Sequence, residues 1–411
     1  MTQIENSIWY YLVIQRLKIE YSSPPQQETL SSHMNKSYIS FLALLLSLVT
    51  IKMSAEPLLV FVGAYAGKPD EGITAYSMCD QSGKLTLTTV MGGQKNPSFV
   101  EVHPSGKFLY AVNEIGSFDG EKQGAISSYS LDSKTGNLKL LNQQPTRGAS
   151  PCHVSISKDG KSALIANYTG GSVASYRIGD DGKLSPPVSF HQHEGSSVNP
   201  GRQKGPHGHA INLDPANQYA FASDLGLDKI LIYKFDAKTS KLMKHGYASV
   251  APGAGPRHFA ISSNGKYAYP LNELNSTITS FAFDSKKGTL SPFQTISTLP
   301  TGYKGGNSTA EIKIHPNGKF LYSSNRGHDS IAVFKIHEKL GTLTPLQEQK
   351  TGGQTPRNFN ITPNGKFLVA ANQRSNDITV LKLDPETGLL TPTSHRVETP
   401  RPVCIRFLSV E

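Results

Sequence analysis

The sequence predicts an all-β fold, a seven-bladed β-propeller with four-stranded blades. The first observation is a turn of the type "NGK" or "SGK", which recurs at a spacing of about fifty residues. The second is that short runs rich in Val, Ile, Tyr and Phe flank each turn, a composition typical of strands. The third is that the two ends of the chain resemble complementary parts of one repeat.

The repeat occurs six times in recognisable form. A short strand precedes each turn and a second strand follows it, and two further strands end near a segment such as "TGNLKLL" or "KGTLSPF". One four-stranded sheet cannot bury both faces alone, so the repeats must stack face to face around an axis. The six turns are "HPSGKFLYAVNE" (103–114), "SKDGKSALIANY" (157–168), "DPANQYAFASDL" (214–225), "SSNGKYAYPLNE" (262–273), "HPNGKFLYSSNR" (315–326) and "TPNGKFLVAANQ" (362–373).

The seventh blade is predicted to be split between the two ends of the chain. Residues 401–411, "RPVCIRFLSVE", form an opening strand with no turn after it. The segment that begins "PLLVFVGAY" at residue 57 supplies three strands with no opening strand before them. Residues 56–411 are therefore expected to form a single propeller domain whose ring is closed without a covalent link.

The N-terminal residues carry a predicted targeting signal. Residues 34–55, "MNKSYISFLALLLSLVTIKMSA", have a positive start and an apolar core of signal-peptide length. Met34 would then start translation, and residues 1–33 would be a misassigned start or a disordered segment. This predicts a secreted or periplasmic protein with no stable membrane contact after cleavage. An uncleaved membrane anchor and a cytoplasmic location are the alternatives.

Charge and cysteine content exclude several classes of function. The formal charge is +10, but most lysines lie in the recurring turns and are scattered around the ring, so no nucleic-acid partner is expected. Three widely spaced cysteines make neither a disulfide framework nor a zinc site. No carboxylate cluster resembles a metal site, and there is no Gly-x-Ser-x-Gly motif for a covalent serine mechanism. We expect no metal and no cofactor.

Two positions in each repeat are predicted to meet at one mouth of the central channel, and their residue types vary. The first follows the opening proline, and the second lies eight residues after the turn glycine. In the repeat at 214–225, Asn217 takes the place of that glycine, which brings His209 rather than His207 into register. The first column reads Ser98, Cys152, His209, Arg257, Ala310, Arg357 and Val403. The second reads Glu114, Tyr168, Leu225, Glu273, Arg326 and Gln373, with the first blade contributing a residue near Ala64.

The candidate site follows from these columns. Its catalytic candidates are His209, Arg257, Glu273 and Arg326. Its candidate substrate-binding residues are His207, Glu114, Arg357 and Gln373. A hydrated salt-bridge ring that plugs the channel is the alternative, but the arginines cluster on one side, as an asymmetric ligand would require.

Two other histidines lie next to the first column. His153 and His258 each follow a column position by one residue. Because side chains alternate along a strand, they are expected to turn away from the axis into the blade packing.

The chain resembles the seven-bladed lactonase family that includes the bacterial propeller-type 6-phosphogluconolactonase and the fungal 3-carboxymuconate lactonizing enzyme. The resemblance covers residues 57–410. It is carried by "NPSFVEVHPSGKFLYAVNE", "GPHGHAINLDP", "SDLGLDKILIYKFD", "GPRHFAIS", "LNEL" and "SSNRGHDSIAVF". The resemblance implies hydrolysis of a small anionic sugar lactone, with a His, an Arg, a Glu and a second Arg that match His209, Arg257, Glu273 and Arg326. A monomer or weak dimer is expected.

The implied chemistry leaves some roles open. An arginine would stabilise the tetrahedral oxyanion or hold a phosphate or carboxylate. Either Glu273 or His209 would remove a proton from the attacking water. A lactonizing isomerase acting on a muconate, and a non-catalytic secreted propeller that binds an anionic sugar or a protein, are the alternative functions.

Overall fold

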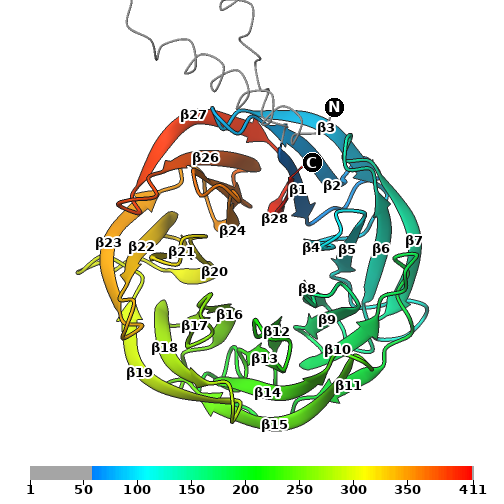
Figure 1. The fold of residues 1–411 in the computed structure, drawn as a ribbon, viewed down its shortest axis with the longest axis horizontal. Helices are drawn as coiled ribbons and strands as arrows, with labels where there is room; N and C mark the ends of the chain where they lie inside the picture. Colours follow the sequence, from blue (N-terminus) through cyan, green and yellow to red (C-terminus); the bar gives the residue numbers. More distant parts are fainter. Residues whose placement is uncertain (1–57, 410–411) are drawn as a thin grey trace, which may run out of the picture. The chain divides into compact units, whose positions relative to one another are not determined.

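The computed structural model describes residues 58–409, whose regular structure consists of strands. Twenty-eight strands form seven four-stranded antiparallel sheets, and Figure 1 shows these sheets arranged as blades around a central axis. The predicted seven-bladed propeller is therefore confirmed, including the blade shared between the two ends of the chain. The predicted signal peptide and the segment before it lie outside the described residues.

The split blade and the two blades after it are built as follows, from the axis outward. The split blade contains β28 (Pro402–Ser409), β1 (Leu58–Ala64), β2 (Gly72–Met78) and β3 (Leu85–Gly92). The next contains β4 (Phe99–Val102), β5 (Phe108–Asn113), β6 (Ala125–Leu131) and β7 (Leu138–Pro145). The third contains β8 (Pro151–Ile156), β9 (Ser162–Asn167), β10 (Ser172–Arg177) and β11 (Ser189–Gln192).

The remaining four blades follow the same order. The fourth contains β12 (Gly208–Leu213), β13 (Tyr219–Asp224), β14 (Lys229–Asp236) and β15 (Lys241–Ser249). The fifth contains β16 (Pro256–Ile261), β17 (Tyr267–Asn272), β18 (Thr277–Asp284) and β19 (Thr289–Ser297). The sixth contains β20 (Ser308–Ile314), β21 (Phe320–Arg326), β22 (Ser330–Ile336) and β23 (Leu343–Lys350). The seventh contains β24 (Pro356–Ile361), β25 (Phe367–Asn372), β26 (Asp377–Leu383) and β27 (Leu390–Glu398).

The recurring turn needs one residue in the left-handed backbone region. Gly265 and Gly318 occupy it with φ of 66° and 75°. Asn217 occupies the same position with φ of 54°, and Asn tolerates this conformation better than most residues with a Cβ atom. The predicted offset in this repeat is therefore correct, and it brings His209 into the channel column.

Neighbouring blades contact each other where an aromatic residue of one blade packs on a glycine of the next. A Cβ atom added to Gly341 would lie 2.3 Å from the ring of Tyr267, which belongs to the preceding blade. Beside it, Tyr269 donates a hydrogen bond of 2.9 Å to the carbonyl oxygen of Gly341. Tyr322 and Gly388 repeat the same bond at 2.8 Å between the next two blades. The glycine in the segment near the end of each repeat, here "LGTLTPL" (340–346), is thus required because an aromatic ring of the preceding blade fills the space that a side chain would need.

A β-bulge near the start of the innermost strand breaks the expected alternation of side chains. In β16, Pro256 lies opposite Asn272 and Phe259 opposite Pro270, so two residues of β16 face only one of β17. Similar register shifts occur near the start of β8, β12, β20 and β24. Bulges of this kind redirect side chains locally.

The bulges place His153 and His258 in the channel. The ring centroids of His153 and His258 are 5.5 Å apart, although the whole β12–β15 blade separates their strands around the ring. Such a contact is possible only across the channel. The prediction that His153 and His258 turn away from the axis is therefore wrong, because strict alternation does not hold through a bulge.

The part of the chain from residue 58 to residue 409 contains no helix long and apolar enough to cross a membrane. It also contains no group of three or more His, Cys, Asp or Glu side chains arranged to hold a metal ion.

Ring closure should dominate the stability of the domain. Ile405 of β28 is fully buried and packs in a cluster with residues such as Val60 and Ile378. We expect Ile405→Ala to lower the free energy of unfolding by about 2–5 kcal/mol, because the substitution removes buried methyl and methylene groups and leaves a cavity. Denaturant unfolding followed by tyrosine fluorescence would measure it.

The matched control is Leu346→Ala, since Leu346 is 40% exposed on the outer strand β23. Deletion of residues 402–411 should be more severe and expose the edge of β1. A truncated chain with an unchanged melting temperature would contradict the role of β28 in closing the ring.

Candidate functional site

One mouth of the channel opens into a strongly polar cavity of about 300 Å³, here called the mouth cavity. Its lining combines residues from inner strands, from the loops after second strands, and from one long loop. The lining residues are Glu114, Cys152, Tyr168, Arg202, His209, Glu273, Ser308, Arg326 and Arg357.

A second and much tighter space, here called the floor cavity, continues from it along the channel. It has room for about one water molecule. Four residues border both cavities, which are therefore adjacent: Glu114, Cys152, His209 and Arg357. The floor cavity is completed by Tyr65, Ser98, Phe99, Arg257, His258 and Val403.

The two predicted columns supply most of this lining. His209, Arg257 and Arg357 lie near the start of the inner strands β12, β16 and β24. Glu273 directly follows β17, and Arg326 is the last residue of β21. Each side chain therefore reaches the mouth because its strand starts or ends there.

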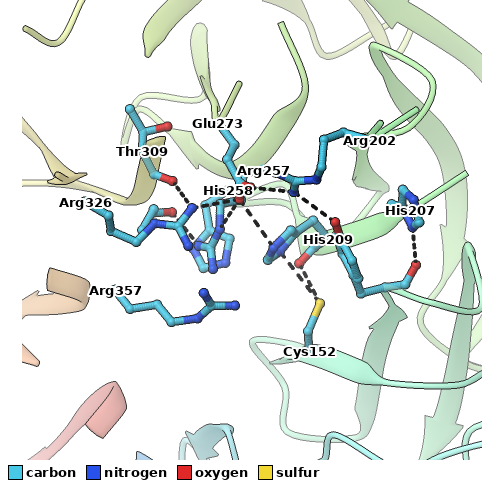
Figure 2. A network of polar contacts seen from close by, with 12 residues as sticks. Cys152, Arg202, His207, His209, Arg257, His258, Glu273, Thr309, Arg326 and Arg357 are labelled. Atoms are coloured by element: carbon cyan, nitrogen blue, oxygen red, sulfur yellow. Dashed lines mark hydrogen bonds and ion pairs between the residues drawn. The ribbon is translucent and has the colours of Figure 1, made fainter. Parts of the chain in front are cut away.

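Glu273 is the centre of the charge network, as Figure 2 shows. Its Oε1 atom lies 2.7 Å from Nη2 of Arg202, while Oε2 lies 2.9 Å from Nη2 of Arg326 and 3.1 Å from Nε of Arg257. Burial alone would raise the pKa of Glu273, but Arg326, Arg257 and Arg202 outweigh it and lower the pKa to about 2. Glu273 is therefore ionised at neutral pH and has little basicity.

Two of these guanidinium groups are also anchored to the backbone of β20. Nη1 of Arg257 donates to the carbonyl oxygen of Ala310 at 2.6 Å, and Nη2 of Arg326 donates to that of Thr309 at 2.7 Å. Burial lowers the pKa of Arg326 to about 9, against the attraction of Glu273. Both groups are thus held rigidly and remain protonated at neutral pH, as preorganised hydrogen-bond donors must be.

His209 is held neutral between the arginines and a thiol. Burial, with a further contribution from the charge of Arg257, lowers its pKa well below 6.5. Its Nε2 atom lies 4.0 Å from Oε2 of Glu273, and its Nδ1 atom lies 3.7 Å from Sγ of Cys152. Burial raises the pKa of the Cys152 thiol, so this cysteine is not an activated nucleophile.

Glu114 forms a second, smaller hydrogen-bond network at the mouth. Glu114 accepts hydrogen bonds from Ser98 Oγ at 2.6 Å and from the Tyr65 hydroxyl at 3.0 Å. Arg357 donates to the same Tyr65 hydroxyl at 3.0 Å. The first blade contributes Tyr65, which directly follows β1 and is adjacent to the predicted position near Ala64.

Two predicted substrate-binding residues do not border either cavity. The ring of His207 stacks on that of Tyr168 with centroids 4.6 Å apart, and its Nδ1–H donates a hydrogen bond of 3.0 Å to the carbonyl oxygen of Tyr168. His207 therefore supports the position of Tyr168 and does not border the cavity. Gln373 contributes a backbone N–H bond of 2.9 Å to Thr355, and its side chain is not part of the lining.

Arg202 is the residue that the column argument missed. It comes from the long loop between β11 and β12, residues 193–207, and not from a strand. Its Nη2 atom also donates a 3.0 Å bond to the Tyr168 hydroxyl. The only sequence signal was the length of this loop, which breaks the regular spacing of the repeat.

Comparison with known proteins agrees with this architecture. The family model described as "Lactonase, 7-bladed beta-propeller" matches residues 59–407. The chain belongs to this family. It is 35% identical to 6-phosphogluconolactonase of Bacillus subtilis over 291 residues, which are 71% of this chain and 81% of that protein.

Two further relatives of this lactonase-family chain are informative. It is 37% identical to 6-phosphogluconolactonase of Formosa agariphila over 71% of this chain and 83% of that protein. The structure of the periplasmic gluconolactonase of Pseudomonas aeruginosa matches with a TM-score of 0.81 at 32% identity, covering 86% of this chain and all of that one.

Glu273 should also support the folded state, because it neutralises buried guanidinium groups. Its pKa is lowered from 4.5 to about 2, so its contribution is complete above pH 4.5 and is lost as the pH falls through about 2. We expect Glu273→Gln to lower the free energy of unfolding at pH 7 by about 3–5 kcal/mol, as when one partner of a buried ion pair is removed.

The same variant should lose less stability than the wild type when the pH is lowered from 4.5 to 2, measured by urea unfolding at each pH. The control is Glu386→Gln, because Glu386 is exposed on a turn. Equal stability of Glu273→Gln and the wild type at pH 7 would show that the arginines do not need this carboxylate.

Proposed function

We propose that the protein hydrolyses a sugar lactone to its acid, with 6-phosphoglucono-1,5-lactone as the substrate. The observation that carries this proposal is the charge of the mouth. Four guanidinium groups, from Arg202, Arg257, Arg326 and Arg357, face only two carboxylates, from Glu114 and Glu273, which leaves two positive charges in excess. A dianionic phosphate on a small sugar ring matches that excess, and arginine is well suited to bind it.

The arginines on Glu273 would stabilise the transition state. When water attacks the lactone carbonyl, negative charge develops on the carbonyl oxygen. Arg257 and Arg326 are held in place by Ala310 and Thr309, so they would need little reorganisation to receive that charge. Glu273 would act by orienting them, and Arg202 and Arg357 would hold the phosphate.

The proton chemistry favours an imidazole over a carboxylate. Glu273 has a pKa of about 2 and its oxygens are occupied by guanidinium groups, so it is a poor general base. Glu114 is occupied by Ser98 and Tyr65. Of the two bases that the sequence left open, the neutral His209 is favoured over Glu273. His258, which borders the floor cavity, is a further imidazole within the channel.

The decisive experiment is a lactone assay on residues 56–411. Lactones hydrolyse in buffer, so the spontaneous rate must be subtracted. Turnover of 6-phosphoglucono-1,5-lactone above that of glucono-1,5-lactone is expected. Tight binding of gluconate 6-phosphate with no turnover of either lactone would instead indicate a binding protein, and turnover of a muconate alone would indicate the isomerase.

Arg257 offers a test of transition-state stabilisation. Arg257→Lys keeps the charge but loses the planar group that contacts both Glu273 and Ala310. We expect kcat/KM for the lactone to fall at least about tenfold, equivalent to about 1.4 kcal/mol of transition-state stabilisation.

Arg177→Lys is the matched control, because Arg177 also donates to a backbone carbonyl but is exposed on the outer part of a blade. If both variants kept the wild-type kcat/KM, the guanidinium group of Arg257 would have no part in catalysis.

We also propose that residues 34–55 direct export of the protein. The support is the apolar run after Lys36 and the periplasmic location of the similar Pseudomonas protein. N-terminal sequencing of the protein from an exporting host should find a mature chain that begins near Glu56. Recovery of the protein only from the cytosol, with the segment intact, would contradict this location.

A further inference from the structure

The floor cavity is bordered by two imidazoles, and that of His258 has no role in the mechanism described above. His258 lies in the bulge of β16, is 4% exposed, and borders the floor cavity directly beside Arg257. Its Nδ1 atom lies 2.9 Å from Oε1 of Glu311. Its Nε2 atom is buried and has no hydrogen-bond partner among the described residues. An unpaired buried nitrogen beside a cavity needs an explanation, because leaving it unsatisfied is costly.

Glu311 determines which nitrogen of His258 carries the proton. Its carboxylate also accepts from the backbone N–H of Ile312 at 2.9 Å and from the side-chain amide of Asn358, and Lys313 lies 3.8 Å away. Burial would raise the pKa of Glu311, but His258 and Lys313 hold it below its ordinary value. Because an ionised carboxylate only accepts, Nδ1 of His258 must carry the proton and Nε2 presents a lone pair.

The floor cavity is suited to one water molecule beneath the substrate. It has space for about one, and it shares His209, Arg357, Glu114 and Cys152 with the mouth cavity above. In Figure 2, His258 lies among Glu273, Arg257, His209 and Arg357. A water bound to Nε2 of His258 would therefore stand between this imidazole and a lactone in the mouth.

We propose that His258 is the general base of the reaction, that Glu311 positions it, and that the floor cavity holds the attacking water. This rests on the proposed lactonase function. The proton of the water passes to Nε2 of His258 while the water oxygen bonds to the carbonyl carbon. The carbonyl π electrons move to its oxygen, beside Arg257 and Arg326. When the C–O bond to the ring oxygen breaks, His258 returns the proton to that oxygen, which yields the hydroxy acid and restores the neutral imidazole.

The other two channel histidines do not have this arrangement. His153 borders neither cavity, and its Nδ1 atom is 3.5 Å from the backbone N–H of Ile211. His209 borders both cavities, but its nitrogens face Glu273 and Cys152, and no carboxylate is within hydrogen-bonding distance of either. Of these three histidines, His258 alone borders a cavity and combines a carboxylate on one nitrogen with an unpaired second nitrogen, the arrangement that orients an imidazole base.

The pH dependence follows from the groups that face His258. These are Glu311 and Lys313 of β20, Arg257 of its own strand, His209 of β12 and His153 of β8. Burial lowers the pKa of His258 to about 4, with Glu311 opposing this change. The base form is lost below that pH, so kcat/KM should be level near neutral pH and fall as the pH drops through about 4.

The test compares His258→Gln with His153→Gln, since both imidazoles are buried in the same layer of the channel. Gln keeps a polar group but has no basic nitrogen. We expect His258→Gln to lower kcat by about a hundredfold, with KM and the affinity for gluconate 6-phosphate nearly unchanged. His153→Gln should keep kcat within about threefold. Equal kcat values for the two variants would overturn the proposal.

Glu311→Gln provides a second measurement if the first variant folds poorly. Loss of this carboxylate removes the charge that stabilises the imidazolium, so kcat should fall and the acidic limb of the pH profile should move to lower pH. An unshifted acidic limb would overturn the positioning role. A wild-type chain without turnover of any lactone would contradict the proposed function itself, whereas active enzyme with fully active His258→Gln contradicts only the assignment of the base.

Discussion

The structure depends on the need of each blade to bury both of its faces. A four-stranded sheet of this composition is stable only between two neighbours, so the ring must close and no blade can be left at an end. Closure is achieved by β28, which pairs along the whole of β1 from Leu58 to Ala64 and brings Ile405 into the core between the last blade and the first. The aromatic residues that pack on the glycine of the next blade repeat the same constraint around the ring.

Ring closure is also what makes the site possible. Side chains from six blades converge at the mouth, and those of distant blades can meet there only because the ring is closed. Because these charges are taken out of water, each must find a partner, and Glu273 supplies one carboxylate to three guanidinium groups. The result is a rigid cationic surface whose remaining hydrogen-bonding capacity is directed at a ligand. Because three guanidinium groups surround it, the carboxylate of Glu273 is too acidic to serve as a base.

The bulges of the inner strands add a second layer of function beneath the first. In an ideal strand, Arg257 would face the channel and His258 would face the next blade. The extra residue in β16 lets both reach the axis, where both border the floor cavity. Glu311, in the bulge of β20, reaches His258 in the same way. In β16 and β20, a single irregularity therefore lets a second side chain of the strand reach the channel.

The sequence by itself determined the number of blades, the split blade and the columns that form the mouth. These are local properties: the spacing of turns, the left-handed residue that Asn217 supplies, and the position of a side chain relative to the end of its strand. It therefore also located Glu273, Arg257 and Arg326. The tertiary structure alone decided the partners of Glu273, since Arg202 comes from an irregular loop whose path no periodicity describes. It also decided the direction of His258, because a bulge arises from the pairing of two strands and their packing, and a strand read alone shows only the alternation that the bulge interrupts.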